Sequence, residues 1–230
     1  MLGAVAAVAI VGLALVIGRS DDDSGDDPPP GVTLADLEPA LLTLDDVGSD
    51  YDLAAADDDD DSEDALDADT VDASDECRTA LGAFEASDAT SESVEIDFED
   101  EVDGTIQHSM SLTGDGQPQL ADVRAALEEC DTMTSEQDGG EITYAFDITD
   151  VDGPGDDAFG MTVAVDLSAP GYDLSFEMYG LMWQRDGVIS SVAGFGGFDE
   201  EALEGLPPDT DEVHDLAAVA DARLEEVLAG

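Results

Sequence analysis

Few residues in this 230-residue chain other than carboxylates could do acid–base or nucleophilic chemistry, because it holds only two histidines and two cysteines. Nucleophilic catalysis needs a nucleophile, a base and a group that orients the base. His108 falls on the inward face of an expected strand, which favours a hydrogen-bonded core histidine over a general base. His214 falls in the first turn of an expected helix, where we expect it to be exposed. The sequence has no G-x-S-x-G motif, and carboxylate pairs are unavoidable at this composition, so we expect no catalytic residues and no enzymatic activity.

Aspartate-rich stretches raise the question of calcium, which binds carboxylate and carbonyl oxygens. A calcium-binding loop needs Gly at its sixth position and Glu at its twelfth, whereas counting from Asp57 gives Ser62 and Ala68. The Gly, Pro and Asp loop at 150–157 also lacks the full ligand spacing. The GFGG stretch at 194–197 does not precede an expected helix, so it is not a dinucleotide-binding fingerprint. We therefore expect neither a metal nor a cofactor.

The charge of the chain is extreme, with 60 Asp and Glu residues against five Arg, no Lys, and a formal net charge of −55. Such self-repulsion destabilises the compact state at low ionic strength, whereas molar salt shortens the screening length to roughly 3 Å. We favour a protein from a saline-adapted bacterium over one with a merely acidic, soluble surface. We expect neither nucleic acid nor an anionic membrane surface as a partner, because binding phosphates needs basic groups.

The two cysteines, Cys77 and Cys130, have no metal-binding spacing. Each lies on the apolar stripe of an expected helix, where the two could meet. A single pair in an exported domain suggests one disulfide, worth about 4 kcal/mol in the chain-entropy model. Two free, buried thiols are the alternative.

The N-terminal stretch Met1–Gly18 is apolar throughout and just long enough to span a bilayer as a helix. No basic segment precedes it, and neither a convincing cleavage site nor a lipobox cysteine follows. The positive charge of Arg19, taken alone, favours an orientation with the rest of the chain in the cytoplasm. The cysteine pair and the export-type linker argue for the outside, and we favour that orientation.

The chain therefore divides into a transmembrane anchor or signal segment (1–19), an acidic Pro-rich linker (20–31) and a folded domain (32–230) with an acidic disordered loop at 54–72. We favour an uncleaved anchor over a cleaved signal. The expected location is the cell membrane with the domain extracytoplasmic, or the medium if the segment is cleaved.

Tyr172–Gly197 carries the strongest structural signal, a β-hairpin turning at Asp186-Gly187, a dipeptide that suits the positive φ angles of a type I′ turn. A two-residue loop places Arg185 opposite Val188, and alternation then assigns the two faces. The expected core face holds Leu174, Phe176, Met178, Gly180, Met182, Ile189, Ser191, Ala193 and Phe195.

The opposite face of the hairpin carries an apolar stripe that is our candidate ligand surface: Tyr179, Leu181, Trp183 and Val192. The stripe either lines an apolar groove or partner surface, or is covered by the C-terminal helix. We favour the helix, because its own apolar stripe needs a sheet to pack on.

Period-two alternation predicts strands at about 94–98, 106–112, 142–148 and 159–167, which with the hairpin make about six. Helical spacing predicts about four helices, at about 33–47, 74–86, 117–130 and 210–228. Pro39 marks a break or restart in the first of these.

The order of these elements resembles the PknH-like extracellular sensor domain family of actinobacterial secreted or anchored proteins, over about Leu34–Leu228. Leu41–Gly48 resembles the family's opening LLT-x-x-D-x-G, Gly155–Ala158 its GDxA turn, and Trp183–Val192 its x-R-x-G-x-V strand pair. Leu216–Leu224 resembles its closing LA-x-x-A-x-x-RL, and the two cysteines each sit on a helix.

The resemblance implies an α+β fold: a twisted antiparallel β-sheet of about six strands packed against about four helices, after an N-terminal apolar helix, with a cleft. The kinase sensor of this family carries two disulfides, whereas this chain has cysteines for one. The family has no established catalytic residues, and without a kinase domain any signalling requires a partner.

We expect a non-enzymatic extracytoplasmic sensor or ligand-binding module, whose partner is an unknown small molecule or envelope protein. The alternative is a cell-envelope structural or interaction protein without a small-molecule ligand. A deep apolar cleft beside Tyr179 and Trp183 favours the first, and a stripe fully covered by a helix favours the second. An enzyme, the third class, needs His108 in a cleft with a carboxylate and a hydroxyl partner.

Overall fold

A computed structural model describes residues 31–54, 71–79, 93–100, 104–113, 119–137, 140–199 and 204–230. The expected anchor or signal segment and nearly all of the expected linker lie outside these residues, as does most of the expected acidic loop at 54–72. Within the described ranges, no helix is long and apolar enough to cross a membrane.

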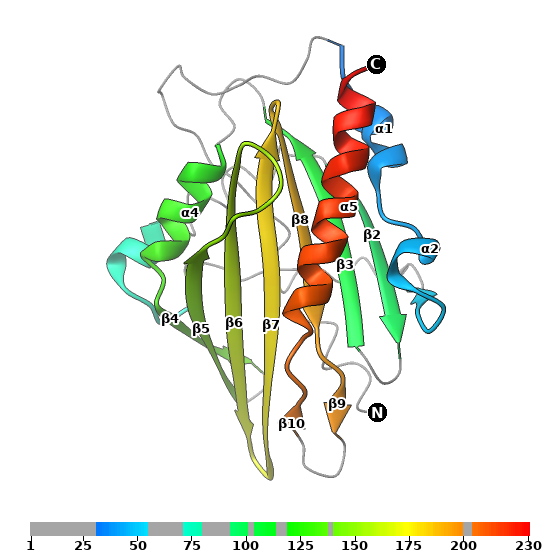
Figure 1. The fold of residues 1–230 in the computed structure, drawn as a ribbon. Helices are drawn as coiled ribbons and strands as arrows, with labels where there is room; N and C mark the ends of the chain where they lie inside the picture. The colour runs from blue at the N-terminus through cyan, green and yellow to red at the C-terminus, as the bar shows by residue number, and fades with distance from the viewer. Residues whose placement is uncertain are drawn as a thin grey trace.

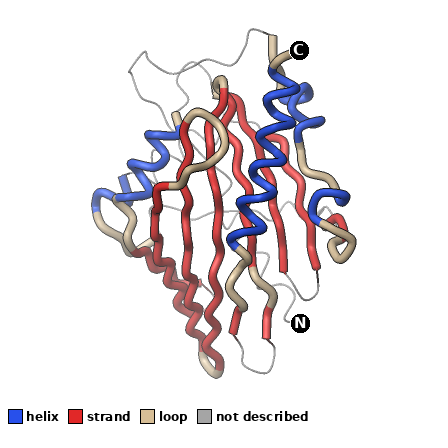
Figure 2. The backbone as a smooth tube through the Cα atoms, viewed as in Figure 1, coloured by secondary structure: helices blue, strands red, loops and turns tan. Residues whose placement is uncertain are grey.

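One antiparallel sheet dominates the described chain (Figures 1 and 2). Its main path runs β1-β2-β3-β8-β7-β6-β5-β4, and a short β9–β10 ribbon joins β7 through a parallel pairing of β10. The strands are β1 (Asp52–Leu53), β2 (Ser93–Asp100), β3 (Gly104–Leu112), β4 (Thr132–Gln137), β5 (Gly140–Asp150), β6 (Asp157–Ala169), β7 (Tyr172–Arg185), β8 (Val188–Phe195), β9 (Phe198–Asp199) and β10 (Glu204–Gly205).

The expected fold class, about six strands packed against about four helices after an N-terminal apolar helix, is wrong. Within the residues that the structure describes, the sheet has ten strands and the helices are few, and the expected N-terminal helix falls outside those residues. β4 escaped prediction because its sequence, TMTSEQ, holds one large apolar residue and so lacks alternation. β1, β9 and β10 have two residues each and are too short to show a period.

The first expected helix is three short pieces: α1 (Leu34–Leu37), the 3₁₀ helix η2 (Glu38–Ala40) and α2 (Leu44–Val47). Pro39 lies in the first turn of η2, where its missing N–H costs no helical hydrogen bond. Thr33 and Thr43 each begin a new helix through a capping box with the aspartate three residues later. The break expected at Pro39 is therefore present.

The other helices are α4 (Leu120–Glu128) and α5 (Thr210–Leu228), and residues 75–79 are also helical. α5 contacts β7, β8 and η2, and Figure 1 shows it lying along one face of the sheet with α1 and α2 beside it. α4 packs with the opposite side of the sheet through Leu120, Val123 and Leu127. The described molecule thus has helices on both faces of one sheet.

The β7–β8 hairpin turns where the sequence predicts. Asp186 and Gly187 have φ of 47° and 73°, and Arg185 pairs with Val188. The core is nonetheless two-sided, because side chains on both faces of the hairpin are buried. Met178, Met182 and Ile189 join the cluster with α4, whereas Leu181 and Val192 join the cluster with α5.

Candidate functional site

Cys77 and Cys130 form a disulfide with 4.8 Å between their Cα atoms, which confirms the predicted pair and excludes two free thiols. Cys77 lies in the helical residues 75–79, and Cys130 follows the end of α4. Ser74 Oγ donates to the Glu129 carbonyl at 3.3 Å beside the bridge. The bridge thus fastens the helical residues 75–79 to the chain just before β4, the edge strand of the sheet.

The predicted ligand-surface stripe of Tyr179, Leu181, Trp183 and Val192 lies beneath α5. Tyr179 is the most exposed of the four, at 6% of its surface, and the other three are at 0%. Val213, Leu216, Ala217 and Ala220 of α5 pack in the same cluster. The helix-covered interpretation that we favoured is the arrangement found, and the stripe lines no open groove.

His108, on β3, is fully buried. The backbone N–H of Leu42 donates to its Nδ1 at 3.1 Å, and its Nε2 lies 3.2 Å from Ser190 Oγ. Because Nδ1 accepts, the proton sits on Nε2 and is donated to the serine. Burial, and secondarily the charge of Arg223, lowers the pKa of His108 to about 3. His108 is therefore a neutral core residue that holds the strand to the segment after η2.

His214 is half-buried, and its Nε2 lies 2.8 Å from the Tyr179 hydroxyl. The two rings stack with centroids 5.7 Å apart, and burial raises the pKa of Tyr179. The expectation of an exposed His214 is thus only partly met. The contact joins α5 to β7 across 35 residues of sequence, and no local pattern in the sequence could have shown it.

A groove of about 630 Å³ opens at the N-terminal end of α5. It lies where the end of β8, the stretch 206–208 after β10 and the first turns of α5 meet. A Cβ on Gly196 would lie 1.8 Å from the Leu206 carbonyl oxygen, so only glycine lets these two stretches touch at their backbones. The apolar lining of the groove consists of Tyr51, Ile106, Phe195, Leu206, Pro207, Pro208 and Leu216.

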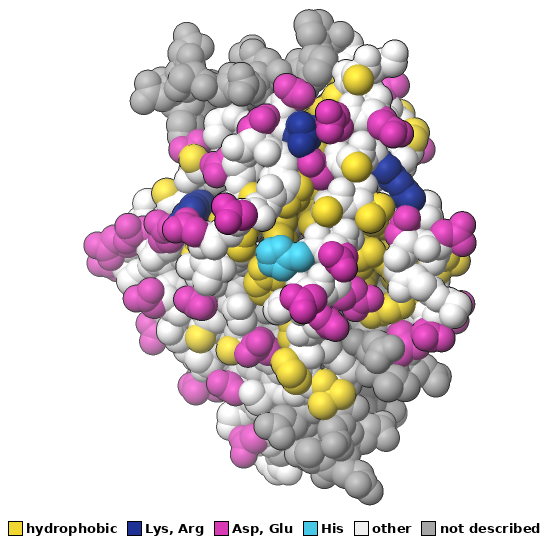
Figure 3. All heavy atoms as spheres, in the orientation of Figure 1, with side chains coloured by type: hydrophobic (Ala, Val, Ile, Leu, Met, Phe, Trp, Pro, Cys, Tyr) yellow, Lys and Arg dark blue, Asp and Glu magenta, His cyan; other side chains and the backbone are white. Residues whose placement is uncertain are grey.

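All the charged residues in the described lining of this groove are acidic: Asp46, Asp209, Asp211, Glu212 and Asp215. In Figure 3, Asp and Glu side chains gather around this end of α5, next to apolar side chains. The lining of the groove therefore combines apolar side chains, called its floor below, with carboxylates, called its rim. Sequence reasoning missed it, because its residues come from separate stretches of the chain.

Two of these carboxylates already have structural partners. Asp209 Oδ1 accepts from the backbone N–H groups of Asp211 and Glu212 at 3.0 and 3.2 Å, and so caps α5. Asp46 accepts from Thr43 and from Arg223, whose Nη2 lies 2.7 Å from Oδ1. Burial works to raise the pKa of Asp46, but these hydrogen bonds outweigh it and lower the pKa.

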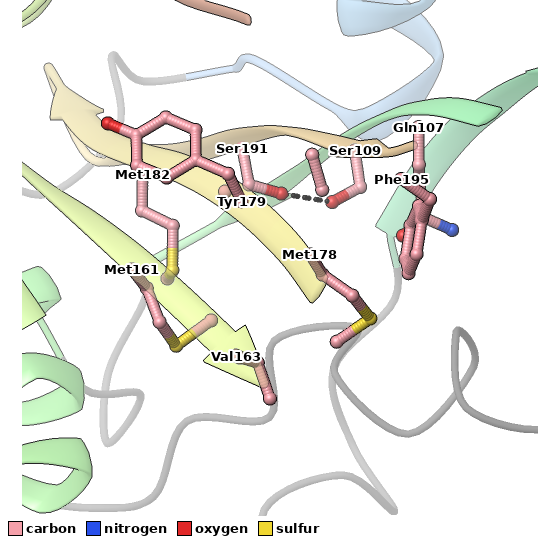
Figure 4. A pocket seen from close by; sticks show the side chains of 11 residues that line it. Gln107, Ser109, Met161, Val163, Met178, Tyr179, Met182, Ser191 and Phe195 are labelled. Carbon is pink, nitrogen blue, oxygen red and sulfur yellow. Dashed lines mark hydrogen bonds between the residues drawn. The ribbon is translucent and has the colours of Figure 1, made fainter. Parts of the chain in front are cut away.

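A second, much smaller cavity of about 30 Å³ lies on the opposite face of the sheet (Figure 4). Met161, Met178 and Met182 lie along it, and Ser109 and Ser191 are hydrogen-bonded at 2.9 Å beside it. A volume of this size holds one or two water molecules, so it is too small for an organic ligand.

Comparisons with known proteins give one structural similarity. No protein-family model matches the sequence, and no characterised protein matches it at a significant level. Among solved structures, the chain is similar to the extracellular domain of PknH from Mycobacterium tuberculosis, with a TM-score of 0.49 and 13% identity. The match covers 88% of this chain and 100% of that one.

Proposed function

We propose that this chain is an extracytoplasmic, non-enzymatic sensor or ligand-binding module, anchored to or exported across the membrane of a saline-adapted bacterium. The observation that carries the proposal is the Cys77–Cys130 disulfide. Disulfides form and persist in oxidising compartments outside the cytoplasm. The bridge therefore supports the same orientation as the linker after Met1–Gly18, and it opposes the one that Arg19 alone favours.

The groove at the N-terminal end of α5 is the ligand site in this proposal. Its volume of about 630 Å³ falls in the range of roughly 300–1,000 Å³ typical of small-molecule sites. It replaces the stripe of Tyr179, Leu181, Trp183 and Val192, which α5 covers. The partner is a small molecule or a segment of an envelope protein, and the N-terminal segment contacts the membrane.

The positions of the two histidines support a non-enzymatic role. His108 is neutral and is used to hold Leu42, and His214 is paired with Tyr179. The ionisable side chains that line the groove are carboxylates and the phenol of Tyr51. Carboxylate pairs are unavoidable in a chain with 60 Asp and Glu residues, so their presence in the groove does not by itself indicate catalysis.

Intact mass tests the proposal on the full-length protein recovered from its native membrane and medium fractions. Mass is measured before and after reduction and alkylation. We expect full-length protein in the membrane fraction, with thiols that react only after reduction. Thiols that alkylate in the denatured protein without reduction would place the domain in the cytoplasm and overturn the proposal.

One observation favours a second candidate, a cell-envelope structural or interaction protein without a small-molecule ligand. α5 covers the apolar stripe on β7 and β8, and Tyr179 and Trp183 are buried beneath it. Native mass spectrometry of the protein from its envelope fraction separates the two. A stable complex with another protein and no bound small molecule favours the second candidate, whereas a small-molecule adduct favours the first.

A further inference from the structure

We infer that the groove at the N-terminal end of α5 binds an organic cation that carries an apolar body. The inference rests on the proposed function, in which this groove is the ligand site, and it names the class of ligand. Three features carry it: the apolar floor, the acidic rim without bases, and two carboxylates of the rim that have no described partner.

The floor of the groove is apolar and partly open to solvent. Leu206 is 48% exposed, one of four large hydrophobic side chains with such exposure in the described ranges. It lies between the ribbon and Pro207, facing the same groove as Ile106 and Phe195. Covering this surface with the apolar part of a ligand is favourable, because it removes hydrocarbon from water.

Two carboxylates of the rim, Asp211 and Asp215, have no hydrogen-bond or ion-pair partner among the residues that the structure describes. Both residues are exposed on α5. The two residues are four apart in a helix, so their side chains are neighbours and their like charges repel. A cation between them relieves this repulsion, which an anion would increase.

Other charged ligands fit the groove less well. The positive end of the α5 dipole is already occupied by the carboxylate of Asp209, so it offers no free anion site. A bare metal ion needs several oxygen ligands that converge. No group of three or more His, Cys, Asp or Glu side chains arranged to hold a metal occurs among the described residues. A cation with its own apolar body uses both the rim and the floor.

Methyl NMR on the full-length chain in zwitterionic nanodiscs tests this, at a salt concentration where circular dichroism shows the domain folded. The probe is benzyltrimethylammonium, compared with benzyl alcohol (neutral), benzenesulfonate (anionic) and tetramethylammonium (no apolar body). We expect benzyltrimethylammonium to shift the methyl signals of Ile106, Leu206 and Leu216 at the lowest concentration of the four.

Paired variants provide the control. Asp211→Asn with Asp215→Asn is expected to weaken binding of benzyltrimethylammonium about threefold to tenfold, as expected for two exposed charge contacts. Asp131→Asn with Asp152→Asn removes the same charge from exposed residues that do not line the groove, and we expect no change in affinity. Circular dichroism of both double variants checks that α5 stays helical.

The outcomes distinguish a wrong ligand class from a wrong binding site. If benzyl alcohol shifts the same methyl groups as strongly as the cation, or both double variants weaken binding equally, the ligand class is wrong while the groove remains a binding site. If none of the four probes shifts these methyl groups, the groove is not the ligand site, and both this inference and the site in the proposed function fail.

Discussion

Arg223 and Asp46 form an ion pair between α5 and α2, with 2.7 Å between Nη2 and Oδ1, although 177 residues separate them in sequence. Arg223 Nη1 also donates to the Leu41 carbonyl at 2.8 Å. Next to this, the Leu42 N–H donates to His108. Together these bonds fasten the segment that contains α1, η2 and α2, within residues 31–47, to α5 and to β3.

Arg223→Met is expected to reduce the free energy of unfolding by about 2 kcal/mol, because it removes two hydrogen bonds from a charged group in a partly buried setting. The exposed pair of Arg78 and Asp75 provides the control, and Arg78→Met is expected to cost less than about 1 kcal/mol. Urea unfolding at one fixed salt concentration measures both. Equal losses in the two variants would show that the contacts of Arg223 stabilise the fold no more than an exposed surface ion pair does.

His108 makes the protein less stable as the pH falls. Its pKa is about 3 in the folded state and roughly 6.5 when unfolded, so the unfolded state binds more protons between these values. The stability contribution is complete above pH 6.5 and is lost as the pH falls towards 3. The linkage amounts to about 2 kcal/mol between pH 7.5 and pH 5.

His108→Asn removes this titration and keeps an acceptor for the Leu42 N–H. The variant is expected to lose about 2 kcal/mol less stability than the wild-type protein between pH 7.5 and pH 5. Urea unfolding at both pH values gives the two differences. Identical losses in the two proteins would mean that His108 is not neutral in the core.

Asp97, on β2, behaves in the opposite sense. Burial raises its pKa despite a hydrogen bond from Gln107, and its Oδ1 is buried without a partner among the residues described. The folded state therefore takes up a proton at a higher pH than the unfolded state, so the ionised carboxylate destabilises the fold at neutral pH. This penalty disappears as the pH falls through the raised pKa.

Asp97→Asn is accordingly expected to raise the free energy of unfolding at pH 7, by roughly 1 kcal/mol as for relief of one poorly satisfied buried group. The gain should disappear as the pH falls through the raised pKa of the wild-type Asp97 carboxyl. Asp166→Asn, exposed on β6, controls for the loss of one negative charge. A gain in Asp166→Asn as large as in Asp97→Asn would assign the effect to net charge.

The disulfide should be the largest single contributor among these. Replacing both Cys77 and Cys130 by Ala opens a loop with a sequence separation of 53 and is expected to cost about 4 kcal/mol. Urea unfolding of the wild-type protein with reductant should approach the value of the double variant. A reduced wild-type protein as stable as the oxidised one would contradict the prediction.

The sequence predicts this fold best where a short turn motif fixes the register of two long strands. The two-residue loop at Asp186-Gly187 sets the register of all of β8 against β7, and every expected pair is found. Alternation cannot say whether the second face is also covered, and so it left the stripe around Leu181 and Trp183 open. The apolar stripe of the C-terminal helix favoured coverage, and the placement of α5 over the sheet confirms it.

The candidate site was far less predictable. Asp46, Phe195 and Leu206 line one groove only because the fold brings α2, β8 and the stretch after β10 together. In the sequence, the Gly196-Gly197 and Pro207-Pro208 pairs mark a loop there, but nothing shows that its residues face the start of α5. β4 shows the same limit from another cause, since Thr132–Gln137 forms a strand through its partner β5 and not through its own pattern.

The bonds from Arg223 to Leu41 and from Leu42 to His108 also bear on how the domain responds to a pulling force. A pull on the chain before Val32 would act first on the packing of α1, whose Leu37 is fully buried, and then on the bonds of Arg223 and His108 around Leu41 and Leu42. Arg223 belongs to α5, and Asp46 both binds Arg223 and lines the groove. The ion pair of Asp46 and Arg223 therefore links the segment before α2 both to α5 and to the lining of the groove.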